Sequence, residues 1–303
     1  MKGILVTGMS RSGTTWIGRV LAARPELAYL HEPTNIDCAW HAWNVGLPHQ
    51  FMYLDGANAA PYRARFERLL SLRPIWSSLF RTRANPMRVR KMLEQAALLG
   101  NARTEGRRPL LKDPLAVFSS DWLARELGLE VVVAVRHPAA VASSRRKLGW
   151  RFDFEHLVRQ PALIELLPPS YRTELEAIAR DTSRDILDES AMLWKLVYWF
   201  VQERLRAHER HIMVRHEDLC LDPAGQFESL FGRIGLPFDR AVADIVDEHS
   251  ASTSSEPPSR TEVRRKSADL VDRWRDELGP DEVARIRDRV GDVANLFYSN
   301  DGW

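Results

Sequence analysis

Residues 3–16 read Gly-Ile-Leu-Val-Thr-Gly-Met-Ser-Arg-Ser-Gly-Thr-Thr-Trp, and this stretch decides the fold. Gly3–Thr7 is apolar without alternation, which is the pattern of a strand buried on both faces of a parallel sheet. A glycine-bearing turn follows over Gly8–Gly13, and a helix is predicted from about 14 to 23. A strand, a turn and a helix in this order form a phosphate-binding loop, because backbone N–H groups and the positive end of the helix dipole face one anion.

The loop differs from that of ATP-binding proteins in the place of its cation. Gly8 and Gly13 have the G-x-x-x-x-G spacing of the nucleotide P-loop, but the following position, a lysine there, is Thr14. The cation lies inside the loop, at Arg11, and the clearest apolar strand ends in Arg136 instead of a magnesium-binding aspartate. A glycine turn without a ligand is the alternative. The agreement of loop, helix and cation favours an anionic nucleotide bound without magnesium–ATP chemistry.

The rest of the chain alternates strands and helices. Further apolar runs predict strands at Leu27–His31, Pro109–Lys112, Glu130–Arg136 and His211–Arg215. Helical patterns occupy about 61–72, 85–99, 117–127, 151–180, 185–208, 223–234 and 239–248; a further helix starts at Pro138, and two close the chain. Without hairpin signals, this order predicts an α/β fold: a P-loop NTPase-like, doubly wound, mostly parallel sheet flanked by helices. No repeat or linker divides the chain, so we expect residues 1–303 to form one domain.

Composition narrows the function. Lys and Arg number 43 against 41 Asp and Glu, a net charge of +2, which argues against a nucleic-acid coat or a polybasic membrane binder. Cys38 and Cys220 are too few for a disulfide scaffold or a Cys-built zinc site, and no His/Cys cluster has metal-ligand spacing. No apolar run reaches the ~18–20 residues of a membrane span, and no signal-peptide core follows Met1. We therefore expect a cytoplasmic protein without bound metal.

The phosphate loop resembles that of a known family, the sulfotransferases that use 3′-phosphoadenosine 5′-phosphosulfate (PAPS). Their 5′-phosphosulfate loop reads like P-[KR]-S-G-T-T-W, and this chain matches it from the cation onward, with Ser10 in place of the proline. The resemblance implies that PAPS is the co-substrate and that its 5′ end is bound by Arg11, Ser12, Gly13, Thr14, Thr15 and Trp16. Trp16 would face the adenine, although the third position of an amphipathic helix suits a core residue equally well.

A second stretch resembles the family's 3′-phosphate motif, an arginine at a strand end with a serine eight residues on. Here these are Arg136 and Ser144, with Ala140 where an acidic residue is often found. Arg136 can bind a phosphate with two parallel hydrogen bonds, and Ser144 lies about two turns into the predicted helix. Each residue alone could be an ordinary surface side chain. Two motifs in the right order, each at a strand-to-helix junction, favour the binding role.

The segment 249–266 is polar, Ser-rich and long for a loop within a compact domain, so it is functional or disordered. It ends in Arg264, Arg265 and Lys266, which resemble in position the basic loop that closes over the 3′-phosphate in the cytosolic members. Ser267 replaces the glycine that usually follows. A solvated run of charges is the alternative.

Sulfuryl transfer needs a base for the acceptor hydroxyl and positive charge near the transferring and leaving groups. Candidates should follow strands, because ligands bind at the carboxyl ends of a parallel sheet. The phenol and steroid enzymes carry their base histidine where this chain has Pro114, so that assignment fails. Tyrosylprotein, carbohydrate and several bacterial members resemble this chain more closely. The resemblance implies Glu32 as general base, with Lys112 and Arg11 stabilising charge, and His31 is the alternative base.

The acceptor is less defined. Trp40 and Trp43, in the aromatic-rich stretch 34–60, could stack on a sugar or an apolar acceptor, or form a satellite core. The basic window 81–91 could attract an anionic acceptor, but a solvated helix face is favoured. We expect a small-molecule or glycan hydroxyl as acceptor. A P-loop kinase and a non-catalytic nucleotide-binding protein are the alternatives.

Overall fold

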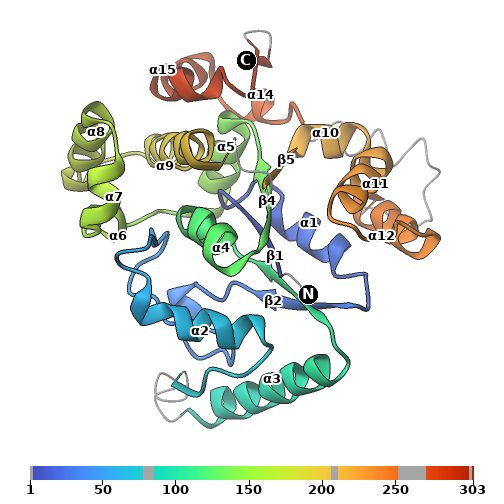
Figure 1. The fold of residues 1–303 in the computed structure, drawn as a ribbon. Coiled ribbons are helices and arrows are strands. Elements are labelled where there is room, and N and C mark those ends of the chain that lie inside the picture. Colours follow the sequence, from blue (N-terminus) through green and yellow to red (C-terminus); the bar gives the residue numbers. More distant parts are fainter. Residues whose placement is uncertain (1–2, 78–84, 206–210, 252–270, 300–301) are drawn as a thin grey trace.

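A computed structural model of the chain describes residues 3–77, 85–205, 211–251, 271–299 and 302–303 (Figure 1). Its centre is a sheet of five parallel strands in the order β2-β3-β1-β4-β5. The strands are β1 (Ile4–Gly8), β2 (Leu27–His31), β3 (Arg108–Lys112), β4 (Glu130–Val135) and β5 (His211–Arg215). All five predicted strands are therefore present, and the predicted α/β class is confirmed.

Helices cover both faces of the sheet (Figure 1). One face carries α1 (Thr14–Leu21), α11 (Pro223–Arg233) and α12 (Arg240–Ala251), and the other carries α4 (Ser120–Leu127), α5 (Pro138–Leu148) and α9 (Ile186–Phe200). Successive strand residues point to opposite faces, so Ile4 and Val6 pack under α1 while Leu5 packs toward α5 and α9. Both faces are apolar, which explains why the strands read as continuous apolar runs.

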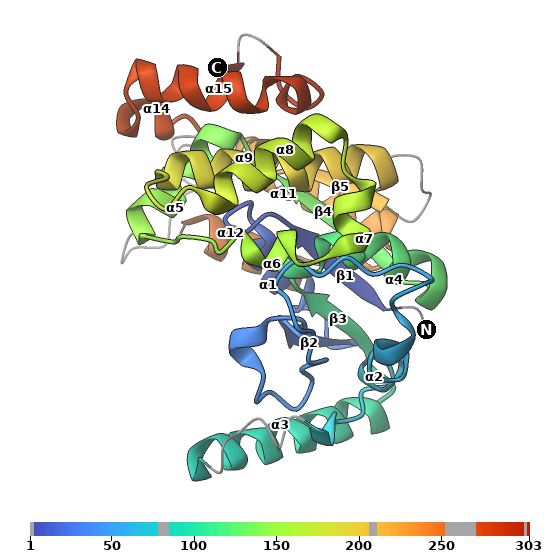
Figure 2. The same ribbon diagram turned by 90° about the vertical axis from the view of Figure 1, so that its left-hand side faces the viewer.

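The remaining helices surround this three-layer core. They are α2 (Ala60–Leu70), α3 (Pro86–Thr104), α6 (Glu155–Val158), α7 (Pro161–Leu166), α8 (Pro169–Arg180), α10 (His216–Leu221), α14 (Trp274–Glu277) and α15 (Pro280–Ala294). Short 3₁₀ turns occupy Ile36–Cys38 and Pro114–Ser119, and a π turn, Val201–Leu205, continues α9. Figures 1 and 2 show α14 and α15 stacked beyond α5 and α9, at the end of the molecule opposite α3.

Several predicted helices are wrong in detail. The single helix predicted over 151–180 is three helices, because Pro161 and Pro169 each begin a new one and a proline is disfavoured inside a helix. The helix predicted to start at 117 begins as a 3₁₀ turn, and α10 was not predicted. Residues 249–251 extend α12, and the remainder of the polar segment 249–266 lies outside the described residues.

Candidate functional site

The phosphate loop connects β1 to α1 in a tight turn. The backbone N–H of Ser12 donates to the carbonyl of Met9 at 3.2 Å. Arg11 and Gly13 adopt left-handed φ values of 75° and 91°. A Cβ on Gly13 would lie 2.7 Å from Nδ1 of His216, so the loop requires glycine there for both conformation and space. Helix α1 then begins without a side-chain cap, which leaves its first N–H groups for an anion.

Buried side chains hold this loop from beneath. The hydroxyl of Tyr198, on α9, donates to the carbonyl of Ala134 at 2.7 Å, so the Ser12 hydroxyl, 2.9 Å away, donates to the Tyr198 oxygen. Nη1 of Arg145 donates to Oγ of Ser10 at 3.1 Å. Burial lowers the pKa of Arg145 to about 10, which still leaves the guanidinium charged at neutral pH. A buried cation therefore lies under the loop in addition to the loop's own arginine.

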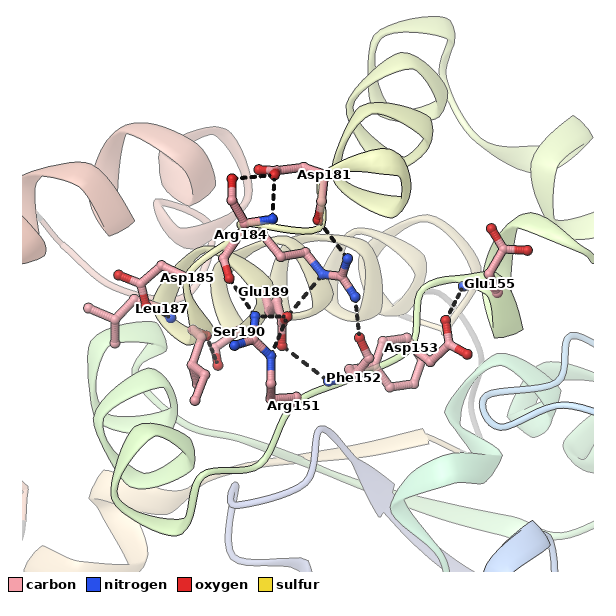
Figure 3. Close-up of polar contacts among 12 residues, drawn as sticks. Arg151, Phe152, Asp153, Glu155, Asp181, Arg184, Asp185, Leu187, Glu189 and Ser190 are labelled. Atoms are coloured by element: carbon pink, nitrogen blue, oxygen red, sulfur yellow. Dashed lines mark hydrogen bonds and ion pairs between the residues drawn. The ribbon is translucent and has the colours of Figure 1, made fainter.

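Residues at the start of α9 form hydrogen bonds and ion pairs with the segment that follows α5 (Figure 3). The Glu189 carboxylate is fully buried and accepts hydrogen bonds from Nη2 of Arg151 at 2.8 Å and Nε of Arg184 at 2.9 Å. The next residue, Ser190, accepts from Nε of Arg145 at 3.1 Å. Because the buried carboxylate is matched by two guanidinium groups, this cluster fixes the segment after α5 against α9.

The two predicted nucleotide motifs meet at one pocket of about 370 Å³, whose lining includes Arg11, Arg136, Ala140, Ser144, His216 and Trp274. Nε of Arg11 donates to Oγ of Ser144 at 2.9 Å, and Nη1 of Arg136 donates to the carbonyl of Arg11 at 3.1 Å. The guanidinium of Arg11 also lies over the ring of Trp150, 5.5 Å from its centroid. The loop cation and the proposed 3′-phosphate residues thus form one cluster.

His216 forms a neutral wall of this pocket. Burial, together with the charges of Arg136 and Arg11, lowers its pKa to about 3. Its Nδ1 has no hydrogen-bond partner among the described residues. Trp16 lies edge-on to His216 and to Phe227, with ring centroids 6.0 and 5.4 Å apart, and packs against the core under α1. The positive charge of the pocket therefore comes from arginine and lysine side chains.

A second cluster lies at the carboxyl ends of β2 and β3. Nζ of Lys112 is 2.5 Å from Oε1 of Glu32, and Nδ2 of Asn35 donates to Oε2 at 2.7 Å. Glu32 has a φ of 47°, and its N–H donates to the carbonyl of Lys112 at 2.8 Å. A left-handed glutamate is costly and is typical of functional sites. Nε2 of His31 lies 3.7 Å from the same carboxylate, so both candidate bases are at this edge.

Electrostatics favours an ionised Glu32. Burial alone would raise the pKa of this carboxyl, but the charge and hydrogen bond of Lys112 and the hydrogen bond of Asn35 leave it below its ordinary value. Burial and the Lys112 charge also lower the pKa of His31. The Lys112 side chain is only 2% exposed, and its stem crosses α1 at Gly18, where a Cβ would lie 2.9 Å from Cγ of Lys112.

Asp113, the residue after Lys112, holds two backbone turns in place. Its carboxylate accepts the N–H of Thr34 at 2.7 Å and that of Leu115 at 3.0 Å. Complete burial raises the pKa of Asp113 to about 7. The two hydrogen bonds fix the turns that follow β2 and β3, and these turns carry the Glu32–Lys112 pair.

The two clusters share the carboxyl edge of the sheet, where Val6 of β1 pairs with Lys112 of β3. Among the described residues, Arg11 makes no hydrogen bond or ion pair with Glu32 or Lys112; its side chain faces Ser144. The predicted residues Arg264 and Arg265 lie outside the described residues.

On the acceptor side, Nε1 of Trp43 donates to the carbonyl of His31 at 3.0 Å, and its ring packs on the core. Trp40 lies edge-on to His41, with ring centroids 4.2 Å apart. Trp43 therefore supports the backbone of the candidate base residues. In the basic window, the described cations, Arg88, Arg90 and Lys91, are exposed on α3.

Sequence reasoning did not identify Arg145, Tyr198 and His216, which support or contact the phosphate loop, nor the lining residues Lys147, Arg273, Trp274 and Glu277. The one signal in the sequence for Arg145 is its position directly after Ser144, the serine of the 3′-phosphate motif. Tyr198 and His216 follow no motif and reach the loop from far along the chain. Their places depend on tertiary packing.

The parallel sheet, the phosphate loop after its central strand β1 and the cationic pocket define an α/β protein of the P-loop class. A family model described as "Sulfotransferase family" matches residues 3–240, and the chain belongs to that family. The predicted enzyme class, a sulfotransferase, is therefore confirmed.

Relatives agree with this assignment. Carbohydrate sulfotransferase 1 of Homo sapiens is 23% identical over 339 aligned positions, covering 97% of this chain and 79% of that protein. The protein of the same name from Mus musculus is 23% identical over 342 positions, with the same coverage. A solved structure, the sulfotransferase domain from the curacin biosynthetic pathway, matches with a TM-score of 0.50 and 15% identity, covering 96% of this chain and 98% of that one. At this identity the structure supports the fold alone.

None of the helices within the described residues is long and apolar enough to cross a membrane. Within the same residues, no three or more His, Cys, Asp or Glu side chains gather in a way that could hold a metal ion.

Proposed function

We propose that the protein transfers the sulfuryl group of PAPS to a hydroxyl of a small-molecule or glycan acceptor. The observation that carries this proposal is the hydrogen bond between Arg11 and Ser144, 2.9 Å long, because it joins the two nucleotide motifs across one pocket. PAPS carries anionic groups at both its 5′ and its 3′ positions, so it needs two anion sites in one pocket. A single phosphate loop would suit any nucleotide.

Each end of the nucleotide then has its own residues. The free N–H groups at the start of α1 and the Arg11 side chain would receive the 5′-phosphosulfate. Arg136 and Ser144 would receive the 3′-phosphate, Arg136 through its fork of N–H donors. His216, beside these residues, is neutral at physiological pH because its pKa is lowered, so the charge that binds the phosphates comes from the arginines and does not change as the histidine titrates.

The transfer step uses the second cluster. The acceptor oxygen attacks sulfur while the bond from sulfur to the bridging phosphate oxygen breaks. Glu32 accepts the proton of the acceptor hydroxyl, and the charge that develops on the sulfonate and the leaving phosphate faces Lys112 and Arg11. The ion pair of Glu32 with Lys112 keeps the carboxylate ionised and therefore ready to accept a proton.

Nucleotide preference tests the proposal. 3′,5′-Diphosphoadenosine (PAP) should bind far more tightly than ATP in calorimetry. Arg136→Ala should weaken PAP binding by ~10-fold or more, because a lost hydrogen bond to a charged group is worth ~1.5–3 kcal/mol. Equal affinity for ATP and PAP would contradict PAPS as co-substrate.

The acceptor class rests on the relatives and on the chain itself. The matched relatives are named carbohydrate sulfotransferases. In this chain His41 lies close enough to His31 and Glu32 to interact with their charges, and the ring of Trp40 packs edge-on against His41. Incubation with ³⁵S-labelled PAPS and fractionated extracts of the source organism will show which pool takes up label. A glycan or small-molecule fraction supports the proposal, and label confined to protein would contradict it. The cytoplasmic location expected from the sequence stays a prediction, checked by cell fractionation.

A further inference from the structure

One face of α5 lines the nucleotide pocket beyond the recognised motif. Ala140, Ser144 and Lys147 are spaced i, i+4 and i+7, which places them on one side of the helix, and all three line the pocket. Lys147 therefore lies one turn beyond the serine of the 3′-phosphate motif. Its side chain is half exposed, so its ammonium group is at the rim of the pocket.

A carboxylate from α14 meets this lysine. Glu277 also lines the pocket, and it accepts hydrogen bonds from Nζ of Lys147 and Oγ of Ser143. Nε of Arg273, another lining residue, is 3.0 Å from Oε1 of the same carboxylate. An ammonium, a guanidinium and a hydroxyl around one oxyanion are also the donors that a phosphate group takes.

Helix α14 is held in place without the Glu277 side chain. Arg146 donates to the backbone carbonyl of Glu277, and its Nη1 is 2.7 Å from Oε1 of Glu282. The ring of Trp274 stacks on that of His137, with centroids 4.6 Å apart and planes within 9°. A change of the Glu277 carboxylate should therefore leave α14 beside the pocket.

The charge of the pocket can be compared with the charge of the nucleotide. Among the described residues, the pocket is lined by four cations, Arg11, Arg136, Lys147 and Arg273, and by one carboxylate, Glu277. Each phosphate monoester carries about −1.5 to −2 charges at neutral pH, so the two phosphates of PAP carry roughly −3 to −4. Arg11 and Arg136 together balance about half of that charge. The two further cations would balance the rest once they no longer face Glu277.

We propose that Lys147 and Arg273 bind the 3′-phosphate together with Arg136 and Ser144, and that Glu277 holds both cations at the rim until the phosphate replaces its carboxylate as their partner. The inference rests on the proposed use of PAPS. It makes Glu277 a competing anion: the carboxylate lowers the affinity for any nucleotide that draws on Lys147. It also makes Lys147 and Arg273 determinants of selectivity for a nucleotide with a 3′-phosphate.

Calorimetry of the full chain with PAP and with AMP, which lacks the 3′-phosphate, tests this assignment. Lys147→Met should weaken PAP binding by ~10-fold and change AMP binding by less than about twofold. Glu277→Gln should strengthen PAP binding severalfold, a gain that a structural role for the carboxylate does not explain. Lys147→Arg should retain PAP affinity. Lys91→Met removes a charge from an exposed face of α3 and serves as the matched control, with no expected effect on either nucleotide.

The outcomes separate the inference from the proposed function. Wild-type PAP affinity in both Lys147→Met and Glu277→Gln, with binding still dependent on Arg136, overturns the inference and leaves the PAPS proposal standing. Equal losses of PAP and AMP affinity in Lys147→Met also overturn it, because they indicate a general defect. A wild-type chain that binds AMP and PAP equally contradicts the proposed function and the inference together. Thermal unfolding of each variant identifies any loss that comes from misfolding.

Discussion

Gly18→Ala is expected to damage the site through one methyl group. A Cβ at this position of α1 would lie 2.9 Å from Cγ and 3.1 Å from Cβ of Lys112, and 3.2 Å from Cε2 of Tyr29. Cβ and Cγ are the near end of the lysine and cannot swing away without moving β3 or rotating the whole side chain. Overpacking of this kind costs ~1–3 kcal/mol, while replacing a helical glycine with alanine gains ~1 kcal/mol. We expect a net loss of ~0–2 kcal/mol in the free energy of unfolding.

The loss of activity should be larger than the loss of stability. Rotating Lys112 removes its Nζ from Glu32, which it meets at 2.5 Å, and a displacement of ~1 Å in such a group can cost ~100-fold in rate. Urea unfolding measures the stability, and turnover is measured with ³⁵S-labelled PAPS and the acceptor fraction that the wild type labels. Gly100→Ala is the matched control: nothing lies within 4 Å of its Cβ, so it should stabilise α3 by up to ~1 kcal/mol and leave turnover unchanged. If Gly18→Ala is as stable and as active as Gly100→Ala, the close approach does not position Lys112 and the reasoning is refuted.

Three further predictions follow from the site and its surroundings. Glu32→Gln should lower turnover by ~10²–10⁴ with PAP affinity little changed, and His31→Asn should be much milder; a dead His31→Asn with an active Glu32→Gln would exchange their roles. Turnover should survive exhaustive EDTA treatment, because arginine and lysine are proposed to supply the positive charge; a loss that magnesium reverses would favour the kinase alternative. Burial lowers the pKa of His137 and of His216 from 6.5 to about 3, so between these pH values the unfolded chain binds more protons than the folded chain does. Stability should therefore decrease as the pH is lowered through this range, by up to ~1.4 kcal/mol per pH unit for each histidine. His137→Phe should remove one share of that slope in urea unfolding at pH 5 and 7, since among the described residues neither of its ring nitrogens has a partner; an unchanged slope would show that His137 does not titrate as stated.

The sequence predicted the strands better than the helices, for a physical reason. A strand covered on both faces must be apolar throughout, so Glu130–Val135 is visible from composition alone. Helical periodicity shows which face of a helix is buried but not where the helix ends. The single helix predicted over 151–180 therefore included Pro161 and Pro169, although each of them begins a new helix. The second and third helices there begin at Pro161 and Pro169, and no spacing of apolar residues reports such a break.

The residues of the site also fall into two groups, those that could be predicted from the sequence and those that could not. The loop and the Arg136–Ser144 pair were predictable because the loop and Arg136 directly follow strands β1 and β4, where parallel topology sets the position of side chains, and Ser144 lies at a fixed spacing after Arg136. Residues that reach the site through packing were not: Arg145 needs α5 to be turned toward the loop, and Glu277 arrives from 130 residues beyond Lys147. Their roles depend on long-range contacts that no local motif carries.

Arg11 connects the two anion sites, and its geometry limits what nucleotide binding must rearrange. Its backbone is fixed in the left-handed region at a φ of 75°, and Arg136 holds its carbonyl, so only the side chain is free to move. That side chain donates to the oxygen of Ser144, and a hydroxyl that accepts one hydrogen bond still has its own proton to donate. Ser144 can therefore donate to a 3′-phosphate while it keeps Arg11, so no partner need be exchanged at this residue. Lys147 differs, because its positive charge is already paired with the Glu277 carboxylate, and a phosphate would compete with that carboxylate for the charge. For that reason the affinity for the nucleotide should respond to the Glu277 carboxylate.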